Sequence, residues 1–101
     1  MFAALPALCD PTRFGIVELL AGGERSAGEI ERALNVSQPN ASKHLRALRA
    51  AGLVKVRKDR QRRLYRLEPA PLAELDAWLE PFRPFWSGRL DSLQRHLDEE
   101  S

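Results

Sequence analysis

The stretch over residues 37–51, SQPNASKHLRALRAA, constrains the fold of this chain more than any other part of the sequence. Ser37 is a good N-cap, and Pro39 is tolerated in the first turn because its missing N–H would have had no helical partner. Gly52 is the residue type that most readily adopts the left-handed conformation after a helix end. The apolar residues between them recur at four- and three-residue steps and predict one buried stripe. They are Ala41, Leu45 and Leu48.

The opposite face of this predicted helix is polar and basic. Asn or Gln pairs bidentately with adenine in the DNA major groove, and Lys or Arg reaches guanine or phosphate. The residues that we expect to contact DNA from this helix are Ser37, Gln38, Asn40, Ser42, Lys43, His44 and Arg46. Taken alone, the segment is also compatible with an ordinary surface helix, so the neighbouring segments decide between the two interpretations.

Two capped helices precede this stretch. Asp10 is suited to cap a helix over residues 11–21, which the glycine pair at residues 22–23 ends. Its expected buried side chains are Phe14 or Ile16, Val17 and Leu20. Ser26 opens the next helix, because Glu29 completes a capping box. The inward residues of that helix are Ile30 and Leu34, and a short turn, Asn35 and Val36, follows it. Two helices joined by a tight turn, the second with a basic face, form a helix-turn-helix arrangement.

Hydrophobic residues alternate after this unit, at residues 54–57 and again at 63–67, which predicts two β-strands. Residues 59–61 would join them as a hairpin, which must pack on the helices because an isolated hairpin is only marginally stable. The hairpin, which we call the wing, carries four basic residues suited to phosphate contact or minor-groove insertion. They are Lys58, Arg60, Arg62 and Arg63. The alternative is that these charges protect a strand edge against aggregation.

Charge is unevenly distributed along the chain, although the formal net charge is only +2. Between Lys43 and Arg66 there are ten basic residues and one acidic residue, Asp59, whereas the remainder has six basic and thirteen acidic residues. Such asymmetry is typical of a protein that binds a polyanion through one face.

The last third of the chain is predicted to be helical again. Its leucine and aromatic residues keep the helical period across Pro81 and Pro84, so we expect a helix over residues 71–98 that is bent or briefly broken at the prolines. A stripe with two Trp and two Phe indicates an interface, and a second copy of the chain is the expected partner. The alternative is that the stripe is intrachain core. The expected interface residues, including a short N-terminal helix, are Phe2, Leu5, Leu8, Leu75, Trp78, Leu79, Phe82, Phe85, Trp86, Leu90 and Leu93.

Three ordered motifs lie at residues 7–13 (ALCDPTR), 37–45 (SQPNASKHL) and 48–54 (LRAAGLV). They resemble the A-L-A-D-P-T-R motif, the S-Q-P-x-x-S-x-H-L recognition helix and the exit into the wing of the ArsR/SmtB family of bacterial winged helix-turn-helix repressors. The resemblance implies a mainly α-helical fold with a small β-hairpin. It also implies a homodimer that binds an imperfect inverted repeat in a promoter and blocks transcription until something releases it.

The metal-sensing members of that family carry ligands that this chain lacks. Ser26 and Gly28 stand in place of a cysteine pair, and neither supplies a thiolate. Trp78 replaces the histidine that opens a second site on the C-terminal helix, and Arg89 and Ser92 stand about where its distal ligands would be. We therefore expect no sensory metal and no cofactor.

No combination of residues indicates an enzyme, because no serine is accompanied by a base or a glycine-rich elbow. His44 is expected to donate to a phosphate or to orient its helix rather than to be buried, and His96 to lie at a solvated helix end. Cys9 is expected to be a small buried residue, with a redox role in a dimer as the alternative.

These expectations define one domain over residues 1–101, with the helix-turn-helix and wing at 11–67 and dimerisation helices at 1–9 and 71–98. No segment has the roughly 20 apolar residues of a membrane span, and no signal peptide or cysteine pair is evident, so we expect a cytoplasmic protein. The expected function is repression as a homodimer on double-stranded DNA, with an unknown effector. The alternatives are a winged-helix protein-interaction module, or a derepressor that senses a ligand or oxidant through the dimer interface or Cys9.

Overall fold

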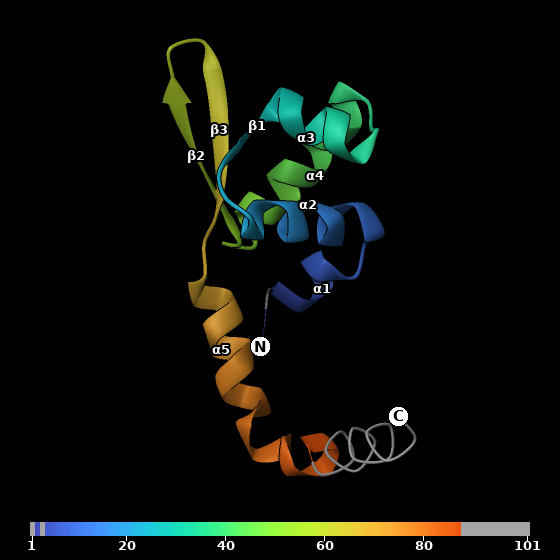
Figure 1. Ribbon diagram of the computed structural model, residues 1–101, viewed down its shortest axis with the longest axis vertical. Coiled ribbons are helices and arrows are strands. Elements are labelled where there is room, and N and C mark those ends of the chain that lie inside the picture. Colours follow the sequence, from blue (N-terminus) through green and yellow to red (C-terminus); the bar gives the residue numbers. More distant parts are fainter. Residues whose placement is uncertain (1, 3, 88–101) are drawn as a thin grey trace, which may run out of the picture.

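The computed structural model describes residue 2 and residues 4–87. This part of the chain forms five α-helices and a three-stranded antiparallel sheet, with the helix-turn-helix and the sheet at one end and the last helix at the other (Figure 1). The helices are α1 (Ala4–Leu8), α2 (Pro11–Ala21), α3 (Ala27–Leu34), α4 (Gln38–Ala50) and α5 (Ala70–Leu79). The strands are β1 (Arg25–Ser26), β2 (Val54–Asp59) and β3 (Arg62–Leu67), and a short 3-10 helix, η1 (Glu80–Phe82), follows α5.

The three helices of the central unit begin at the predicted caps. The Asp10 carboxylate accepts hydrogen bonds from the backbone N–H groups of Thr12 and Arg13, at 2.8 and 3.1 Å, at the start of α2. The capping box at the start of α3 is complete. At the start of α4 the Ser37 hydroxyl accepts from the backbone N–H of Asn40 at 3.3 Å. Each cap satisfies backbone donors that have no partner within the helix, so the local sequence fixes where each helix begins.

Two residues in the left-handed region shape the connections around α4. Asn35 ends α3 with a φ of 53°, and this tight turn reverses the chain into α4. Gly52 has a φ of 77° just after α4, as predicted. Glycine adopts this conformation without the steric cost that a Cβ would bring.

The hydrophobic core lies between the helices of the central unit and the sheet. Its largest fully buried side chains are Ile16, Ile30, Leu48 and Leu53. The sequence left open whether Phe14 or Ile16 of α2 is buried. The structure buries Ile16, whereas Phe14 is 49% exposed. The stripe predicted for α4 is buried throughout, which turns the polar face of that helix outward.

The wing forms as predicted, with pairs from Val54↔Leu67 to Asp59↔Arg62 and a two-residue turn that puts Arg60 at a φ of 61°. The prediction of two strands is incomplete, however, because β1 pairs with β3 and adds a third strand to the sheet. The strand order β1-β3-β2 leaves β2 at the edge of the sheet. A strand of two residues is too short to show an alternating pattern, so periodicity gave no sign of β1.

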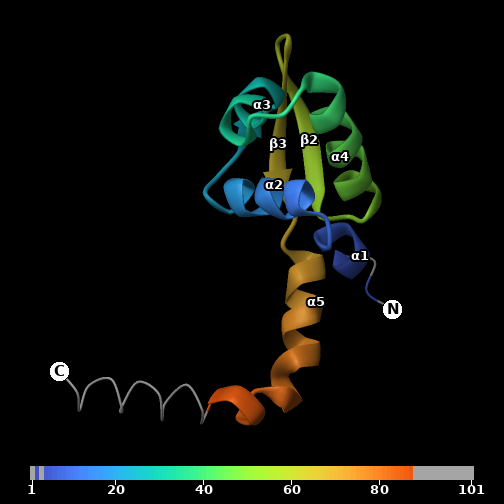
Figure 2. The same ribbon diagram turned by 90° about the vertical axis from the view of Figure 1, so that its right-hand side faces the viewer.

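The C-terminal helix is interrupted at the prolines, as predicted. Helix α5 ends at Leu79, η1 contains Pro81, and residues 84–87 are helical again after a change of direction (Figures 1 and 2). Helix α5 buries none of its residues and projects away from the helix-turn-helix. The rest of the predicted helix lies outside the described residues. That part holds the predicted interface residues Leu90 and Leu93, the predicted helix-end residue His96, and the two positions compared with metal ligands, Arg89 and Ser92.

Candidate nucleic-acid interface

The outward face of α4 gathers most of the residues expected to contact DNA. Six of them are exposed to solvent, whereas the predicted stripe of the same helix is buried. They are Ser37, Gln38, Asn40, Ser42, Lys43 and Arg46. The first turn of α4 therefore presents amide and hydroxyl groups, and the next two turns present positive charge. This is the distribution that a helix needs when its N-terminal end enters the major groove.

The expectation for His44 is corrected by the structure. The side chain is buried, with 5% of the residue exposed, so it does not face a DNA phosphate. Its Nδ1 lies 3.8 Å from Oδ1 of Asp10 and has no hydrogen-bond partner among the described residues. The His44 side chain therefore points from α4 toward the interior, beside the cap of α2. Such a position suits the other role expected of it, which is to orient the recognition helix.

The wing tip lies at the same end of the molecule as the first turn of α4 (Figure 2). Gln38 and Ser42 of α4 line one hollow of about 300 Å³ together with Arg63 of the wing. All four predicted wing residues, Lys58, Arg60, Arg62 and Arg63, are exposed. Arg62 lies 3.6 Å from Asp59, but an ion pair between exposed side chains is weak and leaves Arg62 available to a phosphate.

An ion pair that was not predicted joins the wing to the body of the domain. Nε and Nη2 of Arg57 on β2 donate to the two carboxylate oxygens of Glu24, at 2.9 and 2.8 Å. This side-chain hydrogen bond from Arg57 holds the pKa of Glu24 below its ordinary value. The bidentate geometry restricts the direction of the wing. Because 33 positions separate the two residues, no local pattern in the sequence reports the contact.

The aromatic residues of the C-terminal part are exposed, so the alternative that they are intrachain core is wrong. Trp78 is 46% exposed and Phe85 is 74% exposed, and Phe82 and Trp86 are each 40% exposed. The Phe2 ring meets Trp78 edge-on at 5.9 Å, and Trp78 lies 4.9 Å from Phe82 between ring centroids. These ring contacts join the N-terminal segment, α5 and η1 in one apolar surface. Of the other predicted interface residues that the structure describes, Leu5 is exposed, and Leu8, Leu75 and Leu79 are half-buried.

Cys9 is exposed rather than buried, and its Sγ donates to the backbone oxygen of Leu5 at 3.3 Å. The hydroxyl of Ser26 is engaged in the capping box of α3. Within residues 2 and 4–87, no group of three or more His, Cys, Asp or Glu side chains could hold a metal ion. No helix in the same part of the chain is long and apolar enough to cross a membrane.

A supporting helix, a tight turn, a second helix with an exposed polar face and a basic hairpin beside it define a winged helix-turn-helix protein. Residues 10–56 match the family model described as bacterial regulatory protein, arsR family. Over 97 residues the chain is 42% identical to the HTH-type transcriptional regulator Rv2034 of Mycobacterium tuberculosis, covering 96% of this chain and 88% of that one.

Two further similarities agree with this family. The chain is 36% identical to the transcriptional repressor SdpR of Bacillus subtilis over 76 residues, which cover 75% of this chain and 84% of SdpR. It also resembles the solution structure of a homodimeric winged helix-turn-helix DNA-binding domain from Mycobacterium bovis, a possible ArsR-family regulator. The TM-score is 0.67 and the identity 31%, over 84% of this chain and 81% of that domain. The chain belongs to the ArsR family of bacterial transcriptional regulators.

Proposed function

We propose that this protein represses transcription as a homodimer that binds an inverted repeat in double-stranded DNA. One observation carries the proposal: Gln38 and Ser42, in the N-terminal half of α4, line one hollow together with Arg63 of the wing. A helix and a basic hairpin held side by side can address a major groove and the neighbouring minor groove at once. A relative that is named a repressor, SdpR, supports repression rather than activation.

The contacts divide into two kinds. Gln38 and Asn40 present amides that can pair with adenine edges, so we assign them to base recognition. Lys43, Arg46 and the wing residues are assigned to phosphates, where they add affinity without reading the sequence. The backbone contacts fix the position of α4, and the amides then select the bases.

Dimerisation is assigned to the apolar surface formed by the N-terminal segment, α5 and η1. A two-fold dimer through Phe2, Trp78 and Phe82 would cover side chains that a single copy leaves in water. The related domain from Mycobacterium bovis is described as homodimeric, which supports this assignment. A protein with this function acts where the bacterial chromosome lies, in the cytoplasm.

Selection of bound sequences from a random pool of duplex DNA, at a stated salt concentration, tests the proposal. We expect enriched sites with two inverted half-sites whose centres lie about one helical turn, ~34 Å, or a small multiple apart. A monomeric protein that enriches no sequence and whose affinity for DNA does not depend on salt would overturn the proposal. That result would favour the protein-interaction module instead.

A further inference from the structure

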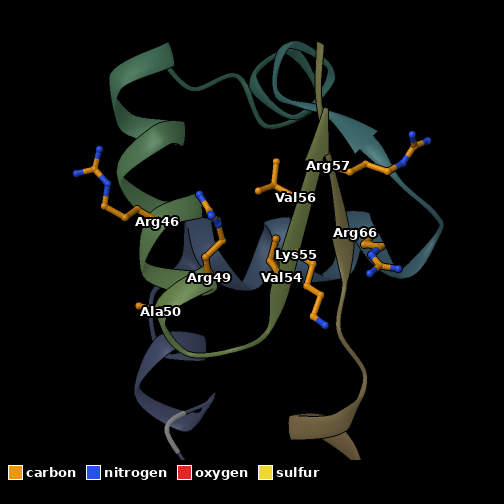
Figure 3. A pocket seen from close by; sticks show the side chains of 8 residues that line it. All are labelled: Arg46, Arg49, Ala50, Val54, Lys55, Val56, Arg57 and Arg66. Carbon is orange, nitrogen blue, oxygen red and sulfur yellow. The ribbon is translucent and has the colours of Figure 1, made fainter. Parts of the chain in front are cut away.

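An open groove lies between α4 and the wing, beside the residues assigned above. Its volume is about 780 Å³, and Ala50, Val54 and Val56 form its apolar part. Its five other lining residues are all basic: Arg46 and Arg49 from α4, Lys55 and Arg57 from β2, and Arg66 from β3 (Figure 3). No described carboxylate lines this groove. Only Arg46 belongs to the set expected from the sequence to contact DNA.

The groove continues toward the wing tip. A second hollow of about 280 Å³ shares Arg49, Val56 and Arg57 with the groove, and adds Lys58 and Arg63. The two hollows together, which we call the basic trough, connect the C-terminal half of α4 to the tip of the wing. Arg49 is the only α4 residue that lines both hollows, so it occupies the middle of the trough.

Much of the positive charge in the trough is available to an anion. Arg46, Arg49 and Arg66 have no carboxylate within 4.0 Å in the part of the chain that the structure describes. Lys55 lies 3.3 Å from Glu68, and Arg57 is paired with Glu24, but neither carboxylate lines the trough. The Lys55–Glu68 pair is screened by salt, so a row of phosphates can compete for Lys55, whereas Arg57 stays in its bidentate pair with Glu24.

The backbone of β2 adds hydrogen-bond donors to the same place. Strand β2 lies between α4 and β3, so its unpaired edge faces α4 (Figure 3). The carbonyl oxygen of Leu53 accepts from the N–H of Glu68 at 2.8 Å. Because inward and outward amides alternate along an antiparallel strand, the N–H groups of Val56 and Lys58 point away from β3, as does that of the buried Val54. The N–H groups of Val56 and Lys58, which are not buried, suit phosphate oxygens.

We propose that the basic trough binds the phosphodiester backbone of the DNA strand that separates the major groove, entered by α4, from the minor groove reached by the wing tip. The inference rests on the proposed function and extends the contact surface to residues that the motifs do not mark, Arg49, Lys55 and Arg66. A strand that passes from one groove to the next must cross between α4 and the wing. The trough lies on that path, and most of its lining residues are basic.

The test compares the salt dependence of DNA affinity in three variants. Arg49→Gln removes one charge from the middle of the trough, Arg49→Lys keeps it, and Arg32→Gln removes a charge from α3, outside both hollows. For Arg49→Gln we expect weaker binding to cognate and random duplexes alike, and a slope of log affinity against log salt that is smaller by about one. Arg49→Lys should restore the slope, and Arg32→Gln should leave it near that of the unmodified protein.

The outcomes separate this inference from the function that it rests on. If the unmodified protein binds DNA and Arg49→Gln keeps its full salt slope, the trough does not bind the DNA backbone, while the proposed function stands. If the unmodified protein binds no DNA, the proposed function fails first. If Arg49→Gln loses affinity for a polyglutamate peptide and not for DNA, the trough is a peptide site and the inference is overturned. The unfolding midpoint of Arg49→Gln should be unchanged, because Arg49 is exposed.

Discussion

Asp10 joins two helices through a single carboxylate. It caps α2, and its Oδ1 lies 3.8 Å from Nδ1 of His44, a buried residue of α4. The hydrogen bond from the backbone N–H of Arg13, then the one from Thr12 and the charge of His44, hold the pKa of Asp10 below its ordinary value. A carboxyl whose pKa is lower in the folded than in the unfolded protein contributes stability above the ordinary pKa. That contribution is lost as the pH falls through the folded value.

Replacing Asp10 by Asn should therefore reduce the acid sensitivity of the fold. Asparagine is also a good N-cap, so the variant keeps the cap but has no charge to titrate. We expect the free energy of unfolding, measured by urea titration, to fall less between neutral and acidic pH in Asp10→Asn than in the unmodified protein. Other carboxylates titrate equally in both proteins and serve as the internal control. Identical pH profiles would contradict the prediction.

Base recognition is also decided at the level of single side chains. Gln38→Ala should cost on the order of 1–3 kcal/mol at cognate sites, because a bidentate contact to a base edge is lost, and little on random DNA. Gln61→Ala, at the exposed turn of the wing, is the matched control and should not change discrimination. Binding assays on both kinds of DNA provide the comparison. Equal losses on cognate and random DNA would remove Gln38 from the recognising set.

The wing is the element whose conformation and charge can be separated experimentally. Its turn places Arg60 at a φ of 61°, a conformation that costs a residue with a Cβ roughly 1–2 kcal/mol. Arg60→Gly removes the charge and relieves this cost together. We therefore expect the unfolding midpoint to be maintained or raised, while the salt slope of DNA binding falls by about one. A selective loss at cognate sites would show that the tip reads bases.

At the scale of the whole molecule, we predict that the apolar surface formed by the N-terminal segment, α5 and η1 decides the assembly. Helix α5 has no buried residue, and it projects away from the core that holds the helix-turn-helix together. Side chains as large as Trp78 and Trp86, left exposed in one copy, are typical of an interface. Pairing two copies through this surface would also set the spacing between two recognition helices.

Trp78→Ser should shift the protein from dimer to monomer, because it removes a large apolar contact from the centre of that surface. Sedimentation at a fixed protein concentration measures the change, and affinity for an inverted repeat should fall toward that for a single half-site. Phe14→Ser is the matched control, since Phe14 is 49% exposed and Trp78 46%, but Phe14 lies on α2. A dimeric Trp78→Ser, or a monomeric Phe14→Ser, would place the interface elsewhere.

The sequence by itself determined the helices, their caps and the break at the prolines. It also determined the buried stripe of α4, because caps and helical periods depend on residues no more than about four positions apart. Only the tertiary structure decided that β1 pairs with β3, that His44 is buried and Cys9 exposed, and that Arg49 stands in a row with the wing cations. These features depend on segments tens of residues apart. Packing of the core brings such segments together, and no local pattern encodes that packing.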